Sequence, residues 1–195
     1  MKRVGLLLLV LFSVSAGGCV IPMPDCRAAD APPAEGAVLP DFKLPVSPLT
    51  EENQYLGVGQ AGSFKVDQIL ADIVILEVFN MYCPHCQKEA PNINRLYGII
   101  SGRGDSGGKI RILGIGAGNS PFEVNTFKKA FDVPFPLFPD EDFAIHQLMG
   151  QVRTPYFAVI KINPDGSHKV LYSRVGSIGE PQRFLQLILN QSESK

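Results

Sequence analysis

The sequence predicts an α/β fold in a single domain, with a central mixed β-sheet flanked by helices. Two continuous apolar runs, IVILEVFN at residues 73–80 and KIRILGIG at 109–116, are typical of strands covered on both faces. A segment with helical spacing separates them, so the two strands should lie parallel. Towards the carboxyl end, YFAVIKIN and HKVLYSRVG flank the turn sequence PDGS, which predicts an antiparallel hairpin.

Residues 1–18 predict an export signal. The basic segment MKR precedes eleven apolar residues, VGLLLLVLFSV, which are too few to cross a bilayer as a helix. The small residues SAGG then lead to Cys19, which we expect to be lipidated as the first residue of the mature protein. Cleavage further along, near residues 27–29, is the alternative and would remove Cys19.

Residues 19–39 predict a flexible tether, because they are rich in Pro, Ala and Asp. The folded domain is expected over residues 40–190. The LPDFKLP piece at 39–45 should dock on its edge.

The other elements follow from apolar spacing and turn residues. TEENQYLG predicts a short helix, and FKVDQIL a short strand or turn. A long helix should begin at CPHC and continue to about residue 100. The later elements are, in order, a helix at 121–131 with Ser120 as its N-cap, an extended piece at 135–138, a helix at 140–150, the hairpin strands 156–163 and 168–176, and a helix at 181–190.

Charge and cysteine usage exclude several classes of protein. The formal net charge is −1, and removal of Lys2 and Arg3 with the signal would make it −3. No basic patch is present, so nucleic acid is not an expected partner. Of four cysteines, Cys19 and Cys26 lie in or beside the leader, and the fate of Cys26 is left open. A single remaining pair cannot staple a fold of this size, so the hydrophobic core must hold it.

That remaining pair, Cys83 and Cys86, begins a predicted helix directly after a predicted strand. The unpaired N–H groups and partial positive charge of a helix N-terminus stabilise a thiolate. We therefore expect Cys83 to attack a partner's disulfide, and Cys86, one turn further in, to resolve the mixed disulfide. Pro84 suits the first helical turn.

Three nearby residues could tune this pair. His85, if protonated, would stabilise the Cys83 thiolate; the alternative is a solvent-facing side chain with little influence. Glu77 lies in an apolar strand, where burial would raise its pKa and make it a proton shuttle for Cys86; the alternative is local exposure. Glu89 shares a helix face with Cys86, but an ordinary surface acid would look the same.

Other uses of the pair find less support. A closed zinc site needs four ligands, and the only histidines are His85, His146 and His168, without paired spacing. Copper held by the two thiolates and a histidine, His85 or His146, remains an alternative. A purely structural disulfide would close a very small loop and contribute little stability.

CPHC between a buried strand and a helix, followed by Thr154-Pro155 before a hairpin and a final helix, resembles the thioredoxin superfamily. Cys83-Cys86-Glu89 and the LPDF lead-in are most similar to the TlpA/ResA-type, membrane-tethered, periplasmic thiol-disulfide oxidoreductases. The resemblance implies a thioredoxin-like fold with a cis Pro155 against the cysteines. It implies that Thr154 offers its backbone to an extended substrate segment, and that Glu77 is the buried acid.

The chain departs from this pattern at several positions. The usual tryptophan before the first cysteine is Tyr82, a candidate for substrate contact. The Pro-His dipeptide resembles DsbA-type oxidants, whereas TlpA-type members commonly reduce, so the direction of electron flow stays open. Peroxiredoxins share the LPDF-like opening, but their threonine three residues before the nucleophile is Asn80 here.

The resemblance implies an exported, lipid-anchored enzyme on the periplasmic side of a bacterial envelope. It would exchange disulfides with cysteines of envelope proteins and be reset by a membrane redox partner. No bound organic cofactor and no metal are expected, because the Cys83–Cys86 disulfide carries the electrons. A thioredoxin-fold copper carrier and a redox-inactive binding module are the alternatives.

Overall fold

The computed structural model describes residues 31–104 and 109–193. The predicted export signal, Cys19, Cys26 and the first part of the predicted tether lie outside these ranges. Within the described ranges, no helix combines the length and the apolar character that crossing a membrane requires.

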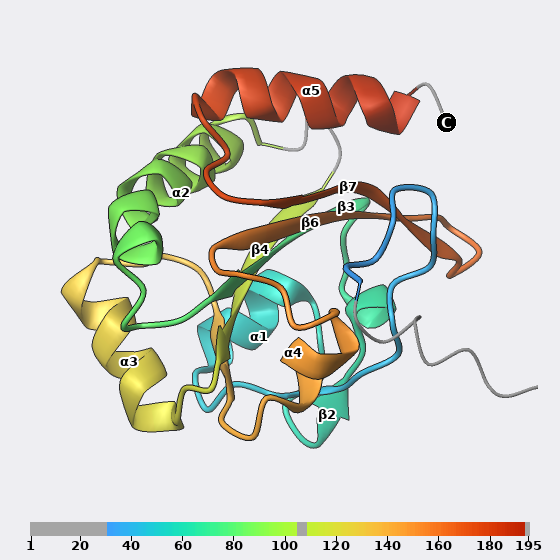
Figure 1. Ribbon diagram of the computed structural model, residues 1–195. Helices are drawn as coiled ribbons and strands as arrows, with labels where there is room; N and C mark the ends of the chain where they lie inside the picture. The colour runs from blue at the N-terminus through green and yellow to red at the C-terminus, as the bar shows by residue number, and fades with distance from the viewer. Residues whose placement is uncertain (1–30, 105–108, 194–195) are drawn as a thin grey trace, which may run out of the picture.

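A five-stranded mixed sheet forms the centre of the domain, as predicted (Figure 1). Its strands, in spatial order, are β5 (Leu137–Asp140), β4 (Ile110–Ala117), β3 (Ile73–Phe79), β6 (Tyr156–Ile162) and β7 (His168–Val175). β3 pairs in parallel with β4, and β4 in parallel with β5. β6 runs antiparallel to β3 and forms the predicted hairpin with β7.

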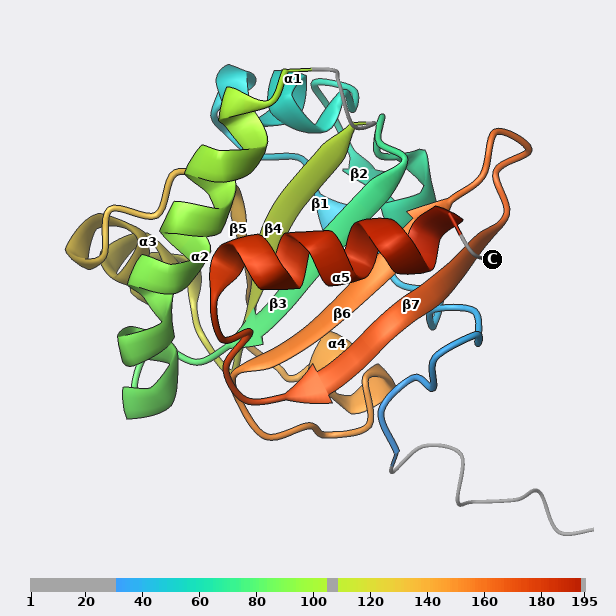
Figure 2. The same ribbon diagram turned by 90° about the horizontal axis from the view of Figure 1, so that it is seen from above.

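Helices cover both faces of this sheet (Figures 1 and 2). One face carries α2 (Pro84–Gly102), α3 (Pro121–Ala130) and α5 (Pro181–Glu193), and the other carries α1 (Thr50–Leu56) and α4 (Ala144–Leu148).

The central strand β3 serves two hydrophobic cores. All seven of its residues are buried. Because side chains alternate along a strand, Ile75 and Phe79 pack in the core under α2 and α5, and Leu76 and Val78 pack in the core on the opposite face. The continuous apolar run of the sequence is the signature of this two-sided burial.

The LPDFKLP segment docks on the domain, as predicted. Leu39, Phe42 and Leu44 are buried in the core on the α1 side of the sheet. Its end forms β1 (Leu44–Pro45), which pairs antiparallel with β2 (Ser63–Phe64). The apolar side chains of this segment therefore close one face of the sheet.

Contacts with the domain begin before residue 40, inside the segment predicted to be a tether. The Gly36 N–H donates to the Val170 carbonyl at 2.7 Å, and the Val170 N–H donates to the Ala37 carbonyl at 2.8 Å. These bonds use backbone groups of the sheet's outer strand β7, which would otherwise be an open edge. Pro-rich composition did not indicate this, because backbone pairing depends little on side chains.

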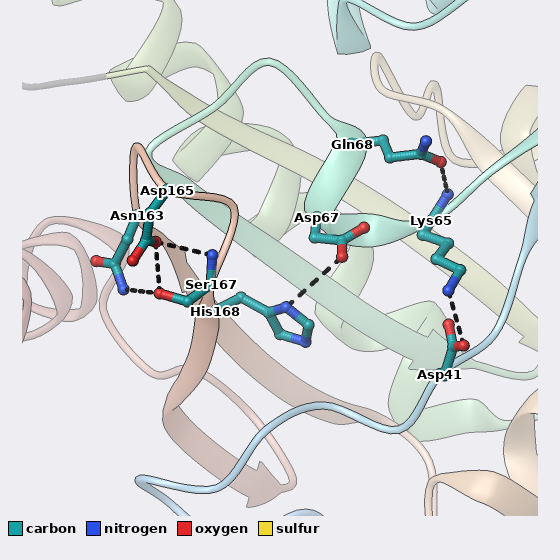
Figure 3. Close-up of polar contacts among 8 residues, drawn as sticks. All are labelled: Asp41, Lys65, Asp67, Gln68, Asn163, Asp165, Ser167 and His168. Carbon is teal, nitrogen blue, oxygen red and sulfur yellow. Dashed lines mark hydrogen bonds and ion pairs between the residues drawn. The ribbon is translucent and has the colours of Figure 1, made fainter.

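The turn between β6 and β7 is built as the PDGS motif predicts (Figure 3). Asp165 Oδ1 accepts the Ser167 N–H at 2.9 Å and the Ser167 hydroxyl at 2.7 Å. Asn163 Nδ2 donates to the same hydroxyl oxygen at 2.9 Å. Gly166 has a φ of +83°, which glycine adopts without steric cost. Local side-chain bonds therefore fix the register of the hairpin.

A second polar cluster joins the docked N-terminal segment to the sheet (Figure 3). Lys65 Nζ lies 2.8 Å from Asp41 Oδ2, and the Lys65 N–H donates to Gln68 at the end of the short 3₁₀ helix η2 (Val66–Gln68). His168 Nδ1 at the start of β7 lies 3.9 Å from Asp67 Oδ2. The Lys65–Asp41 pair is the contact among these that reaches the docked segment, and the other two fix η2 and link it to β7.

The helix predicted over residues 140–150 is wrong in length. Only Ala144–Leu148 is helical, and Asp140 belongs to β5. The buried Asp140 carboxylate accepts the N–H groups of Ile145 at 2.9 Å and His146 at 2.8 Å. Phe143 has a φ of +60°, which a helix cannot contain. Asp140, which the sequence placed in the first turn of this helix, instead lies before the helix, and its side chain accepts hydrogen bonds from N–H groups of the first turn.

We expect Asp140→Ala to destabilise the protein by about 1–3 kcal/mol, because two backbone donors would lose their acceptor. Urea unfolding measures the loss. Asp142→Ala is the matched control, since the exposed Asp142 accepts a single longer bond, 3.2 Å from the Ala144 N–H. Equal losses in the two variants would contradict the role given to Asp140.

Candidate active site

Cys83 lies at the N-cap of α2, just beyond the carboxyl end of β3. Hydrogen bonds with residues at the carboxyl ends of β3 and β4 hold the turn that carries it. The Cys83 N–H donates to the Asn80 carbonyl at 3.0 Å, and Asn80 Nδ2 donates to the Ala117 carbonyl at 2.8 Å. The Met81 N–H donates to Asn119 Oδ1 at 2.8 Å. The position of the first cysteine is therefore fixed by two asparagines.

Of those two, Asn119 was missed by sequence reasoning. It is fully buried and directly precedes Ser120, whose predicted N-cap of α3 is confirmed by its bond from the Glu123 N–H. A signal was present: a polar residue follows the second parallel strand, next to the end of the first. The carboxyl ends of adjacent parallel strands meet at one edge, so residue 119 had to lie near the cysteines.

The Thr154–Pro155 peptide bond is cis, as the resemblance implied. The Cys83 thiol donates to the Thr154 carbonyl oxygen, with Sγ and O 3.3 Å apart. Pro155 is buried, and its carbonyl accepts the Gly176 N–H at 2.7 Å. The structure thus brings residues 83 and 154, far apart in the chain, into direct contact.

The two cysteines differ in exposure and in acidity. Cys83 is half-buried, and Cys86 is fully buried. Burial works to raise the pKa of the Cys83 thiol, but hydrogen bonds with Thr154, with Cys86 and with the N–H of His85 together lower it. Burial raises the pKa of Cys86 to about 12, and the nearby Glu77 carboxyl adds to this rise. Cys83 is therefore the better thiolate at neutral pH.

Glu77 is buried, with 3% of its surface exposed, so the alternative of local exposure is wrong. It shares the strand face of Ile75 and Phe79, which is the face under α2. Burial, and secondly the charge of Glu89, raise its pKa to about 8. Its Oε1 has no hydrogen-bond partner among the described residues. A carboxyl in this setting is protonated over much of the neutral range.

Glu89 is also buried, with 4% exposed, and is not an ordinary surface acid. Its Oε1 accepts the Ile178 N–H at 2.9 Å, and its Oε2 accepts Asn92 Nδ2 at 3.3 Å. It therefore ties α2 to the segment between β7 and α5, beside Pro155 in the same cavity.

The two remaining candidates lie on the surface. His85 is exposed and lines the cavity that contains Glu89 and Pro155. Tyr82 is 66% exposed, and its hydroxyl donates to Glu123 on α3. Among residues 31–104 and 109–193, no group of three or more His, Cys, Asp or Glu side chains is arranged to hold a metal ion.

Residues 36–172 match the model of the AhpC/TSA family. The chain belongs to the AhpC/TSA family. The match spans the sheet from the docked N-terminal segment to β7 and includes both cysteines and the cis proline. Within this family, the peroxidase-type threonine position is occupied by Asn80, whose side chain donates to Ala117.

Among characterised relatives of this AhpC/TSA member is the thiol-disulfide oxidoreductase ResA of Halalkalibacterium halodurans. It is 26% identical over 117 residues, which cover 59% of this chain and 61% of ResA. The chain thus spans less than two thirds of that relative. The TlpA/ResA-like resemblance expected from the sequence is confirmed.

Solved structures confirm the thioredoxin-like fold. A candidate thiol:disulfide interchange protein DsbE from Chlorobium tepidum superposes with a TM-score of 0.60 at 20% identity, covering 82% of this chain and 99% of that one. A secreted disulfide oxidoreductase of Mycobacterium tuberculosis, described as homologous to DsbE of E. coli, superposes with a TM-score of 0.50 at 14% identity, covering 69% and 90%.

Proposed function

We propose that the chain is an exported thiol-disulfide oxidoreductase that exchanges disulfides with cysteines of envelope proteins through Cys83 and Cys86. One observation carries the proposal: a half-exposed thiol of lowered pKa begins α2 beside a cis proline, with a buried thiol of raised pKa one turn further in. An attacking sulfur must be accessible and ionised, whereas a resolving sulfur should stay protonated until needed.

The reducing direction proceeds in two exchanges. The Cys83 thiolate attacks one sulfur of a client disulfide, and the second client sulfur leaves as a thiolate and takes up a proton. Cys86 then loses its proton and attacks Cys83, which releases the first client sulfur as a thiol. The protein ends with a Cys83–Cys86 disulfide, having given two electrons to the client. The oxidising direction is the reverse, and the partner that resets the pair decides between them.

Glu77 is the proton acceptor in this proposal, in its ionised form, which is the minor form at pH 7 and grows as the pH approaches its pKa of about 8. A thiol with a pKa of about 12 is a poor nucleophile at neutral pH, so Cys86 needs a base when it resolves the mixed disulfide. The Glu77 carboxyl is close enough to influence the pKa of Cys86, and its own pKa of about 8 lets it both take up and release a proton near neutrality.

The pair itself carries the electrons, so no organic cofactor is needed. We further propose that Cys19 is lipidated and tethers the domain to a membrane of the envelope. The export pattern of residues 1–18 supports this location, and one structural relative is described as secreted. Clients would be cysteine-containing envelope proteins, and a membrane redox protein would reset the pair.

The test is equilibration with glutathione buffers of defined redox state, followed by thiol trapping and mass spectrometry. We expect one disulfide, Cys83–Cys86, to form and break reversibly, and the reduced protein to cleave insulin disulfides faster than an equal concentration of dithiothreitol. A pair that does not equilibrate would refute the proposal, and a pair that equilibrates but cleaves insulin no faster than the small thiol would contradict the reducing direction.

A further inference from the structure

Two cavities flank the contact between Cys83 and Thr154. One, of about 500 Å³, contains His85, Lys88 and Pro155. The other, of about 490 Å³, contains Tyr82 and Cys83 itself. Both are lined by Arg153 and Thr154, so they adjoin at these two residues, and we treat them as the two halves of one groove beside the attacking sulfur. We call it the Thr154 groove.

The half of the groove beside Pro155 is cationic. Lys88 and Arg153 line it, both are exposed, and neither forms an ion pair with any described residue. His85 adds a third basic side chain. The acid in this wall is Glu89, which is buried and already accepts two hydrogen bonds. This cationic wall belongs to a chain whose formal net charge is −1.

The half of the groove on the other side of Cys83 carries exposed aromatic side chains, with Arg153 at its border with the first half and His146 also in its lining. Tyr82 and Phe143 line it and are 66% and 44% exposed. Phe122, 78% exposed, lies one residue from Glu123, which accepts the Tyr82 hydroxyl. Exposed aromatic side chains beside a reactive group favour contact with apolar side chains of a partner.

We propose, on the basis of the function proposed above, that the Thr154 groove selects extended client segments. These segments carry an acidic side chain on one side of the reacting cysteine and an aromatic side chain on the other. The acid would lie against Lys88 and Arg153, and the aromatic ring against Tyr82 and Phe143. This arrangement selects by charge pattern, whereas the cysteine pair alone would react with any accessible disulfide.

The probes are short peptides with one cysteine, activated as its mixed disulfide with thionitrobenzoate. Cys83 attacks the peptide sulfur and releases the coloured thiolate, and Cys86 then frees the peptide as a thiol, so the protein loses two electrons and the probe gains two. Four peptides combine Glu or Lys on one side with Phe or Ser on the other. Each is made in both orders, because the direction of the segment is not assigned.

We expect the Glu/Phe peptide, in one of its orders, to react roughly three- to tenfold faster than the Lys/Ser peptide at low salt, and the Glu preference to shrink at high salt. The double variant Lys88→Glu/Arg153→Glu should reverse the order of the Glu and Lys peptides. Lys129→Glu, an exposed charge reversal on α3 outside the groove, is the matched control and should keep the wild-type order. Within Tyr82→Ser, the ratio of the rates for the Phe and Ser peptides should fall towards one.

The outcomes separate the two proposals. Equal rates for all peptides would overturn the groove proposal and leave the exchange activity standing. No thiolate release from any peptide would refute the exchange activity. In that case the groove proposal is tested by titrating the protein into fluorescent peptides that carry serine in place of cysteine. Tighter binding of the Glu/Phe peptide than of the Lys/Phe peptide, with the opposite order in Lys88→Glu/Arg153→Glu, would support the proposal. Equal binding of all peptides would overturn it.

Discussion

Replacing Cys83 with serine should lower the rate of disulfide exchange by more than about 10³-fold. A serine hydroxyl is not ionised at neutral pH and cannot displace a sulfur, so the two-step exchange has no first step. The fold should persist, because Cys83 is half-buried and a serine hydroxyl can donate to the Thr154 carbonyl as the thiol does. The rate of insulin cleavage measures the loss, and circular dichroism checks the fold.

Cys86→Ser is the matched variant, and we expect it to trap a client covalently, whereas Cys83→Ser should not react with one. Cys83 would still attack a client, but nothing would resolve the product, so a covalent complex between the chain and the client should accumulate. Non-reducing electrophoresis and mass spectrometry would show the complex and the sulfur that holds it. If Cys83→Ser formed the complex and Cys86→Ser did not, the roles of the two cysteines would be interchanged.

The sequence predicted the sheet well where the residues themselves carried the information. The run at 73–80 is apolar because β3 is covered on both faces, and the PDGS turn forms through its own side chains. Cys83 could be placed at a helix start because Pro84 suits a first turn. These features depend on local composition, which a single sequence records directly.

Features that depend on distant backbone could not be predicted in this way. Gly36 and Ala37 pair with β7 through backbone groups, so composition suggested a tether where the chain adds to a sheet edge. The helix predicted at 140–150 is too long, because the sequence does not distinguish an acidic residue in the first turn of a helix from one that accepts its N–H groups from a preceding strand. Asp140 is of the second kind: it belongs to β5 and accepts the N–H groups of Ile145 and His146.

The candidate site shows the same division. The cysteine pair followed from its motif at a helix start and the buried Glu77 from the strand pattern, whereas the cis Pro155 was implied only by the resemblance to the thioredoxin superfamily. Arg153 and Lys88 did not, since an isolated basic residue in a loop or on a helix has no pattern of its own. Only the fold, which brings residue 154 to residue 83, shows that these charges lie beside the reactive sulfur.

The buried Glu77 should make stability fall as pH rises between about 4.5 and about 8. Its pKa is about 8 in the folded protein against 4.5 for the free side chain, because burial and the charge of Glu89 disfavour ionisation. In this window the folded state binds the proton more tightly than the unfolded state, so raising the pH favours unfolding. A difference of this size corresponds to roughly 5 kcal/mol between the ends of the window.

Urea unfolding of the wild type and of Glu77→Gln, at steps across this window and fixed ionic strength, measures the effect. Gln cannot ionise, so the variant's free energy of unfolding should exceed that of the wild type by an amount that grows with pH. Taking the difference cancels other titrating groups. Glu51→Gln, which removes an exposed carboxyl from α1, should show no such growing difference.

The same substitution links stability to mechanism. If Glu77 accepts the Cys86 proton, Glu77→Gln should slow resolution of the mixed disulfide while leaving the first attack by Cys83 unaffected, and the covalent intermediate should persist longer. A pH-dependent gain in stability without slower resolution would show that Glu77 is a buried acid but not the base. No pH-dependent gain would mean that the carboxyl is hydrated in solution, and the proton would then need another route out of the core.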